Sequence, residues 1–258
     1  MSETGGPRSP FSRRSVRLFA GSIAALLLLG ALVGVLTRGR GASSPPAGST
    51  TDSTDTTLPL NKALPATLAA LMGLTSLHRQ MAPGVTLVNQ RGQIVSSSAL
   101  RGKAVLLTFL DAGCTGICPV ESAELRAAER DLGAKAAGVE MLVVNIDADN
   151  RSTADMVRLA RRTGLGGIAA FQALSGSLAA LRSVWAAYGV QVQVDEVHGT
   201  VIYEPLIVFI DPSGHERYTA TPSAFELASG RYVLPADQIA AFGRGIAHFA
   251  ASLLAGST

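Results

Sequence analysis

Three apolar runs of strand length constrain the fold of this chain more than any other feature. They are Lys103–Asp111, Val139–Asp147 and Pro205–Asp211. Their apolar residues follow one another without the polar alternation of a half-exposed strand, which is typical of strands covered on both faces. Amphipathic helix patterns lie between the runs. The sequence therefore predicts an α/β domain, a mixed sheet with helices on both faces.

Shorter patterns complete this prediction. A turn at Asn89–Gly92 joins two short strands into a hairpin. Further strands are expected at Ala169–Leu174 and His215–Ala220. The predicted helices are a short one ending near Gly73 and four longer ones at Pro119–Leu132, Ser152–Arg162 (capped by Ser152 or Thr153), Ser177–Tyr188 and Ala236–Leu254.

The N-terminal part of the chain is predicted to be a membrane leader. Residues 18–36 are uncharged and apolar, which is long enough to cross a bilayer. Four arginines precede this segment and two follow it, so residues 1–17 are expected in the cytoplasm and the rest outside. No clear cleavage site closes the segment, which favours an uncleaved anchor over a removed signal peptide. Residues 37–62 are predicted to be a flexible linker, and residues 63–258 the folded domain.

The charge balance argues against a nucleic-acid partner. Residues 1–40 carry a net charge of +5, which leaves −2 for residues 41–258 of a chain whose total is +3. The basic character therefore belongs to the leader, and the body lacks a phosphate-tracking surface. The chain has only two cysteines, too few for a disulfide-dense scaffold or a four-cysteine zinc site.

Those two cysteines, Cys114 and Cys118, stand four residues apart where a buried strand ends and a helix begins. Ligands of open α/β sheets bind at this edge, and the amide groups of a helix N-terminus stabilise a thiolate. The pair can close a disulfide or bind one soft cation. Two plainer interpretations are buried apolar cysteines and an inert structural disulfide. The neighbouring Gly113 and Gly116 favour the reactive pair over close packing.

The segment TLVNQRGQIVSSSALRGKAVLLTFLDAGCTGICPVESAEL resembles the opening of the Sco/SenC branch of the thioredoxin superfamily, with its hairpin, L-R-G-K step, buried strand and C-x-x-x-C-P motif. VEMLVVNIDADNRST and LRSVWAAYGV resemble later parts of that family, and the similarity covers roughly residues 82–221. The resemblance implies a thioredoxin-like fold and a membrane-anchored, outward-facing protein. It also implies copper bound through Cys114, Cys118 and a downstream histidine, and a role in maturing the copper centre of cytochrome c oxidase.

His198 is the candidate for that histidine, although it lies farther from the last strand than the family's histidine does. An ungapped alignment from the IDPSG segment puts Tyr203 at the ligand position instead. The same alignment makes EPLIVFID resemble TlpA-like thiol-disulfide reductases, with Pro205 in place of their cis-proline. Asp147 and Asp149 are expected to cap the next helix, or else to accept a proton near the sulfurs.

His78 and Met81 are interpreted as a hinge residue and a core residue, the alternative being soft-metal ligands. His215 and His248 are expected at the surface.

Three functions follow from these patterns. The favoured one is copper binding for oxidase assembly, with a copper-receiving oxidase subunit or another extracytoplasmic cysteine protein as partner. The second is a thiol-disulfide oxidoreductase in which Cys114 attacks a partner disulfide and Cys118 resolves the mixed species. The third is a scaffold module that does not use its cysteines.

Overall fold

The computed structural model describes residues 60–113, 116–195 and 200–256, all of which belong to one compact unit. The predicted membrane segment at residues 18–36 lies outside these ranges. In the described ranges no helix is both long and apolar enough to span a membrane.

The described chain contains twelve strands. In chain order they are β1 (Thr75–Met81), β2 (Thr86–Asn89), β3 (Ile94–Ser96), β4 (Ala104–Leu110), β5 (Val139–Asn145), β6 (Phe171–Ser175), β7 (Gln193–Asp195), β8 (Thr200–Ile202), β9 (Ile207–Ile210), β10 (His215–Ala220), β11 (Phe225–Glu226) and β12 (Tyr232–Val233). The helices are α1 (Leu60–Leu71), α2 (Cys118–Leu132), α3 (Thr153–Thr163), α4 (Leu178–Ala187) and α5 (Ala236–Ala255), with short 3₁₀ helices η1 (Ser97–Leu100), η2 (Gly133–Gly138) and η3 (Leu165–Gly167).

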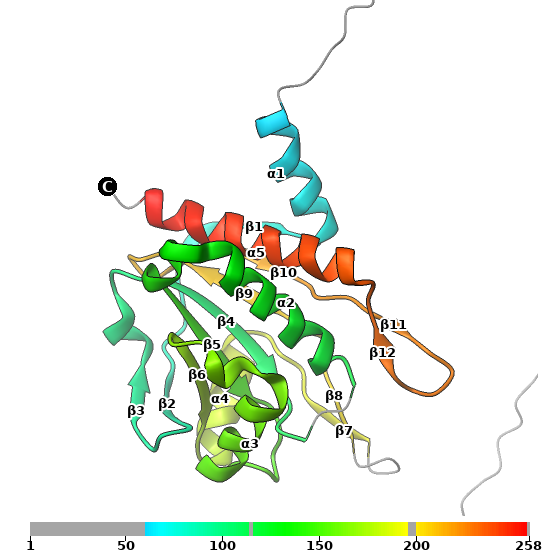
Figure 1. Ribbon diagram of the computed structural model, residues 1–258. Helices are drawn as coiled ribbons and strands as arrows, with labels where there is room; N and C mark the ends of the chain where they lie inside the picture. The colour runs from blue at the N-terminus through cyan, green and yellow to red at the C-terminus, as the bar shows by residue number, and fades with distance from the viewer. Residues whose placement is uncertain (1–59, 114–115, 196–199, 257–258) are drawn as a thin grey trace, which may run out of the picture. The chain divides into compact units, whose positions relative to one another are not determined.

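Eight strands form one mixed sheet in the order β1-β10-β9-β4-β5-β6-β2-β3 (Figure 1). The central strands β4, β5 and β6 are parallel, and their neighbours β9 and β2 run antiparallel to them. Every residue of β4, β5 and β9 is buried, which confirms the interpretation of the three apolar runs. Two small hairpins, β7–β8 and β11–β12, stand apart from this sheet.

Helices cover both faces of the sheet. Buried residues of α2, α3 and α5 form one core cluster with β4, β5 and β9, whereas α4 packs on the opposite face. The mixed sheet with helices on both faces confirms the α/β architecture that the sequence patterns predicted.

Helices α2 and α5 pack at very short range. A Cβ built on Gly243 of α5 would lie 2.4 Å from the Cβ of Ala127, 2.9 Å from the Ala128 nitrogen and 3.0 Å from the Glu124 oxygen. Only glycine fits such a contact between helix backbones. This close packing excludes water from the inner face of α2, which begins at Cys118.

The structure adds strands that the sequence patterns did not predict, namely β1 and the strands of the two small hairpins, β7–β8 and β11–β12. Strand β1 includes His78 and pairs antiparallel with β10 at the edge of the sheet. Six of its seven residues are exposed. A strand exposed on both faces lacks apolar alternation, and for that reason the pattern missed it. Met81 is 56% exposed, so the prediction that it is a core residue is wrong.

Candidate functional site

Cys118 is the first residue of α2, directly after the loop that leaves β4. The side chain is 2% exposed and belongs to the core cluster beneath α2, and its sulfur is disulfide-bonded. Cys114, the chain's only other cysteine, lies outside the described residues. The predicted junction of buried strand and helix is thus confirmed for Cys118.

The first turn of α2 has no side-chain cap. Ile117 precedes the helix and has no group that accepts a hydrogen bond, while its carbonyl accepts from the amides of Val120 and Glu121 at 2.9 and 3.2 Å. Pro119 stands within the first turn, where a missing N–H costs nothing. The amide dipoles of this turn therefore favour a negative charge on a sulfur placed there.

Tyr203 lies against the sulfur of Cys118. Its hydroxyl oxygen is 3.6 Å from the Cys118 Sγ, although 85 residues separate the two in sequence. Burial raises the pKa of the Tyr203 phenol well above its ordinary value, and the charges of Glu121 and Asp111 add to that rise. The phenol therefore stays protonated and can donate a hydrogen bond to the sulfur. This placement agrees with the ungapped alignment that put Tyr203 at the ligand position.

Pro205 follows Tyr203 by two residues. No peptide bond in the described ranges is cis, so the bond that precedes Pro205 is trans. In this respect Pro205 differs from the cis-proline of TlpA-like reductases.

Two carboxyl groups flank Gly113, the last described residue before Cys114. Oxygens of Asp111 and Asp147 would each lie 3.4 Å from a Cβ built on Gly113, and the Gly113 amide donates to Asp111 at 2.6 Å. Burial, and to a smaller extent the negative charge of Asp147, raise the pKa of Asp111 to about 6, although the hydrogen bond from the Gly113 amide opposes the rise. Burial also raises the pKa of Asp147, but hydrogen bonds from Asn150 and Asp149 outweigh it, so the net shift is downward.

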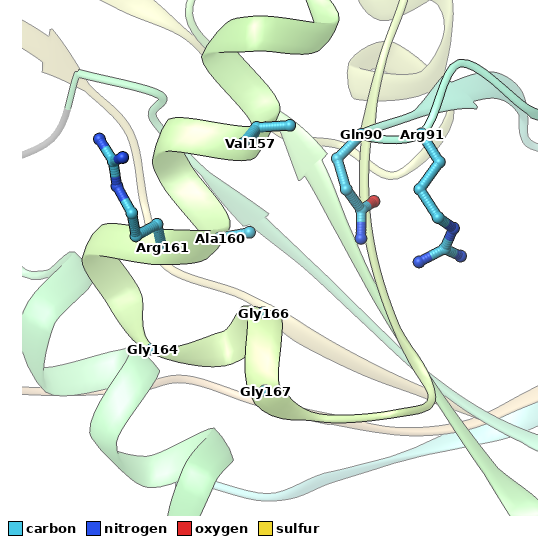
Figure 2. Close-up of a pocket in the computed structure, with 8 residues that line it drawn as sticks. All are labelled: Gln90, Arg91, Val157, Ala160, Arg161, Gly164, Gly166 and Gly167. Carbon is cyan, nitrogen blue, oxygen red and sulfur yellow. The ribbon is translucent and has the colours of Figure 1, made fainter.

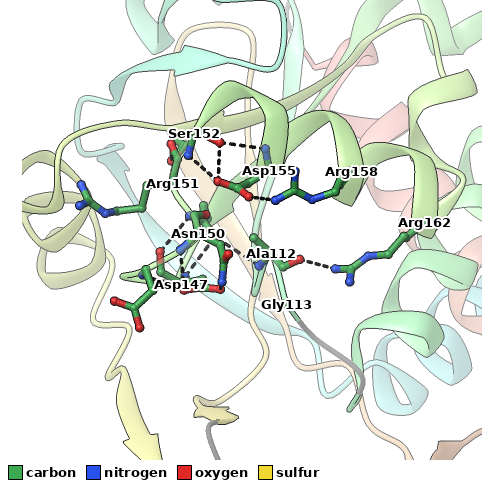
Figure 3. Close-up of polar contacts among 12 residues, drawn as sticks. Ala112, Gly113, Asp147, Asn150, Arg151, Ser152, Asp155, Arg158 and Arg162 are labelled. Atoms are coloured by element: carbon green, nitrogen blue, oxygen red, sulfur yellow. Dashed lines mark hydrogen bonds and ion pairs between the residues drawn. The ribbon is translucent and has the colours of Figure 1, made fainter.

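Asp147 therefore caps its own loop. It accepts hydrogen bonds from the Asp149 and Asn150 amides at 2.8 and 3.0 Å, and Figure 3 shows its contacts with Asn150. The cap of α3 is Ser152, which forms a reciprocal capping box with Asp155. The expectation that Asp147 or Asp149 caps this helix is thus wrong, whereas the prediction of Ser152 is confirmed.

The side chain of Asn145, at the end of β5, forms hydrogen bonds with the loop that follows β4 and with the loop that follows β5. Its side-chain oxygen accepts from the amides of Ala112 and Asp147, and its nitrogen donates to the carbonyls of Asp147 and Asn150. Arg162 of α3 donates to the Ala112 carbonyl, as Figure 3 shows. Sequence reasoning missed both residues. A polar residue directly after the apolar run Met141–Val144 is the signal that could have identified Asn145.

Helix α2 also buries two carboxyl side chains that sequence reasoning missed. Glu121 and Glu124 are both 0% exposed. Glu121 is three residues from Cys118, which places both on one face of the helix, and this spacing is the signal that could have drawn attention to it.

An open cavity of about 530 Å³ lies elsewhere, between the β2–β3 turn, α3 and η3 (Figure 2). Arg91 and Arg161, both exposed, are its charged residues. Neither Cys118 nor Tyr203 lines it, so this cavity is not part of the cysteine site.

The comparisons with known proteins agree with this geometry. The sequence model of the SCO1/SenC family matches residues 75–224, which is more than half of the chain. The chain belongs to the SCO1/SenC family. No curated protein sequence matches it.

Solved Sco structures share the fold. Copper-bound ScoI of Arabidopsis thaliana aligns with a TM-score of 0.54 at 16% identity, over 69% of this chain and 99% of the other. Copper-bound ScoI of Bradyrhizobium japonicum aligns with a TM-score of 0.50 at 21% identity, over 66% of this chain and 98% of the other. Apo Sco1 of Thermus thermophilus aligns with a TM-score of 0.51 at 23% identity, over 67% of this chain and 91% of the other. Identities this low show a common fold and no more.

His198, the predicted third copper ligand, lies outside the described residues. Elsewhere His78 and His248 are exposed, and His215 is half-buried with its Nδ1 3.0 Å from the Ser213 Oγ. Within the described ranges, no cluster of three or more His, Cys, Asp or Glu side chains could hold a metal ion.

Proposed function

We propose that this SCO1/SenC protein binds copper through the sulfurs of Cys114 and Cys118 and the imidazole of His198, and that it serves copper-site assembly in cytochrome c oxidase. The observation that carries the proposal is the position of Cys118. It opens α2 at the edge of a thioredoxin-like sheet, inside the segment that the family model matches. Two solved ScoI proteins of the same fold hold copper.

The donor set suits copper as a cargo. Two thiolates and one imidazole are soft or intermediate ligands, and monovalent copper prefers sulfur. The uncapped first turn of α2 favours the thiolate form that a metal requires. Tyr203 would contribute a hydrogen bond to the Cys118 sulfur, and its high phenol pKa excludes it as an anionic ligand at neutral pH.

The proposal includes a place in the cell. We infer that residues 18–36 anchor the chain in the cell membrane and that residues 37–62 tether an extracytoplasmic domain to it. The arginine distribution supports this orientation. The recipient would then be a copper-receiving oxidase subunit or another extracytoplasmic protein with exposed cysteines.

Copper stoichiometry of the reduced full chain tests this function. We expect one monovalent copper ion per chain in the wild type and none in Cys114→Ser. His198→Ala should retain the ion with a weaker affinity, whereas His78→Ala, which changes an exposed histidine on β1, should bind as the wild type does. Equal copper affinities of the wild type and His198→Ala would show that His198 is not a copper ligand. A wild type that binds no copper would refute the function.

One pair of observations favours a second function, thiol-disulfide oxidoreductase. Cys118 is disulfide-bonded, and the protonated hydroxyl of Tyr203 lies beside its sulfur. In this function Cys114 attacks a partner disulfide and Cys118 resolves the mixed disulfide. Cys118→Ala should then accumulate partners covalently bound to Cys114, and Cys114→Ala should not. A Cys118→Ala protein that traps nothing under oxidising conditions would count against this function.

A further inference from the structure

The open cavity of about 530 Å³ between the β2–β3 turn, α3 and η3 is positively charged (Figure 2). Arg91 of the turn and Arg161 of α3 line it, and no acidic residue is among the residues that do. Neither arginine forms an ion pair within the described ranges. An anion that entered the cavity would therefore meet two positive charges and no competing carboxylate from its walls.

The guanidinium group of Arg91 has donors to spare. Its Nε donates to the Gln93 Oε1 at 3.1 Å, and this bond restrains the plane of the group. Its two terminal nitrogens have no hydrogen-bond partner among the described residues. Two guanidinium nitrogens in one plane match the spacing of two oxygens of a carboxylate or a phosphate. Arg91 can therefore hold one such group through two parallel hydrogen bonds.

The turn that carries Arg91 is already ordered without a ligand. The Asn89 Oδ1 accepts a hydrogen bond from the Arg91 amide at 2.9 Å. The side chain of Gln90, which forms one wall of the cavity, is bound to strand β6. Its Oε1 accepts from the Ala173 amide at 2.9 Å, and its Nε2 donates to the Phe171 carbonyl at 3.3 Å. Because this wall is fixed in advance, a ligand that binds against it loses little affinity to the ordering of the protein.

The opposite wall and the floor of the cavity offer an apolar surface. Val157 and Ala160 of α3 face Gln90 across the cavity (Figure 2), and Val157 is 48% exposed. Gly166 and Gly167 of η3 also line it and have no side chains to fill it. An apolar group placed here would cover the exposed valine, and each Å² of apolar surface removed from water contributes about 25 cal/mol. The cavity thus combines a charged end with a place for a flat apolar body.

The C-terminal end of α3, which borders the cavity, repels an anion less than a free helix end does. The last carbonyls of a helix carry a partial negative charge. Here the Gly164 amide donates to the Arg161 carbonyl at 3.2 Å, and Arg126 of α2 donates to the Thr163 carbonyl and adds its own positive charge. The guanidinium of Arg161 extends from the side of α3 away from Gln90 (Figure 2), so it attracts a ligand through its charge and does not grip it.

We propose that this cavity binds a small, soluble organic anion, with its carboxylate or phosphate group on Arg91 and a flat apolar body between Val157 and the glycines of η3. The volume sets the size of the ligand. It lies within the range of small-molecule pockets, about 300–1,000 Å³, and is far larger than an inorganic anion needs. The inference goes beyond the proposed function, because neither Cys118 nor Tyr203 lines this cavity.

Binding of 2-naphthoate to the full chain tests the inference. This probe joins one carboxylate to a flat apolar ring system. Calorimetry at low ionic strength should show saturable binding at a single site, and ¹H–¹⁵N NMR should show shifts of the Gly166 and Gly167 amides. Acetate, which lacks the rings, and 2-naphthalenemethanol, which lacks the charge, should each bind at least about tenfold more weakly.

Two pairs of variants locate the site. Arg91→Gln should weaken the binding of 2-naphthoate by about tenfold, because it removes two charge-assisted hydrogen bonds. Arg182→Gln changes an exposed arginine of α4, on the other face of the sheet, and should bind as the wild type does. Gly167→Leu should abolish binding, since a Cβ on Gly167 would have no atom within 4 Å and the new side chain can fill the cavity. Gly84→Leu is its matched control, because a Cβ there also lies in open space but outside the cavity.

The outcomes that would overturn the inference are distinct from those that bear on copper. A wild type that does not bind 2-naphthoate, or that binds acetate equally well, refutes the site. Unchanged affinity in Arg91→Gln refutes it as well, and so does tight binding by a Gly167→Leu protein whose urea midpoint equals that of the wild type. Cys114→Ser, which should lose copper, should bind 2-naphthoate as the wild type does.

Discussion

Replacement of Glu124 by glutamine should make the protein more stable at neutral pH. Both carboxyl oxygens of Glu124 are buried and without hydrogen-bond partners in the described ranges, so the exchange to an amide breaks no such bond. Burial, and to a smaller extent the neighbouring Glu121, raise the pKa of Glu124 from 4.5 to about 9. The folded chain thus holds Glu124 neutral at a pH where the unfolded chain ionises it.

The size of the effect follows from proton linkage. Above pH 4.5 the unfolded state binds fewer protons than the folded state, so the free energy of unfolding falls as the pH rises toward 9. Each pH unit costs about 1.4 kcal/mol, which amounts to about 3 kcal/mol between pH 4.5 and pH 7. Glutamine does not ionise and avoids this loss. The free energy of unfolding of Glu124→Gln should therefore be about 3 kcal/mol higher than that of the wild type at pH 7 and equal to it near pH 4.

Urea unfolding of the oxidised full chain at pH 4, 5.5 and 7 measures this difference. Trp185 is the only tryptophan and is 6% exposed, so its fluorescence reports loss of the core directly. Asp131→Asn on the exposed side of α2 is the matched control and should change stability by less than about 0.5 kcal/mol at every pH. A Glu124→Gln protein that is less stable than the wild type at pH 7, by an amount independent of pH, would refute the reasoning.

Two other substitutions test how the structure supports the site. Gly243→Ala should lower the free energy of unfolding by about 2 kcal/mol, because its new Cβ would overlap backbone atoms of α2. Equal urea midpoints for Gly243→Ala and the wild type would contradict the close helix contact. Asn145→Ala removes one hydrogen bond to Ala112 in the loop before the cysteines and three to Asp147 and Asn150 in the loop after β5, and it should cost about 3 kcal/mol. Hydrogen exchange of the Ala112 amide should accelerate in this variant, and unchanged protection would show that another group holds the loop.

The elements of this fold that depend on neighbours in sequence were predictable. The buried strands β4, β5 and β9 follow from continuous apolar runs, and α3 begins directly after Ser152 because a serine oxygen can accept from the third helical amide. Strand β1 was not predictable, since its pairing with β10 across more than 130 residues stabilises it without any apolar pattern of its own.

The site shows the same division. The sequence by itself determined that two cysteines stand at a junction of strand and helix, because strand and helix periodicities meet there. Only the tertiary structure decided what surrounds Cys118. It brings Tyr203 to the sulfur and seals Glu121 and Glu124 between α2, the sheet and α5. A glutamate on a helix normally faces water, and its burial depends on long-range packing that no local pattern encodes.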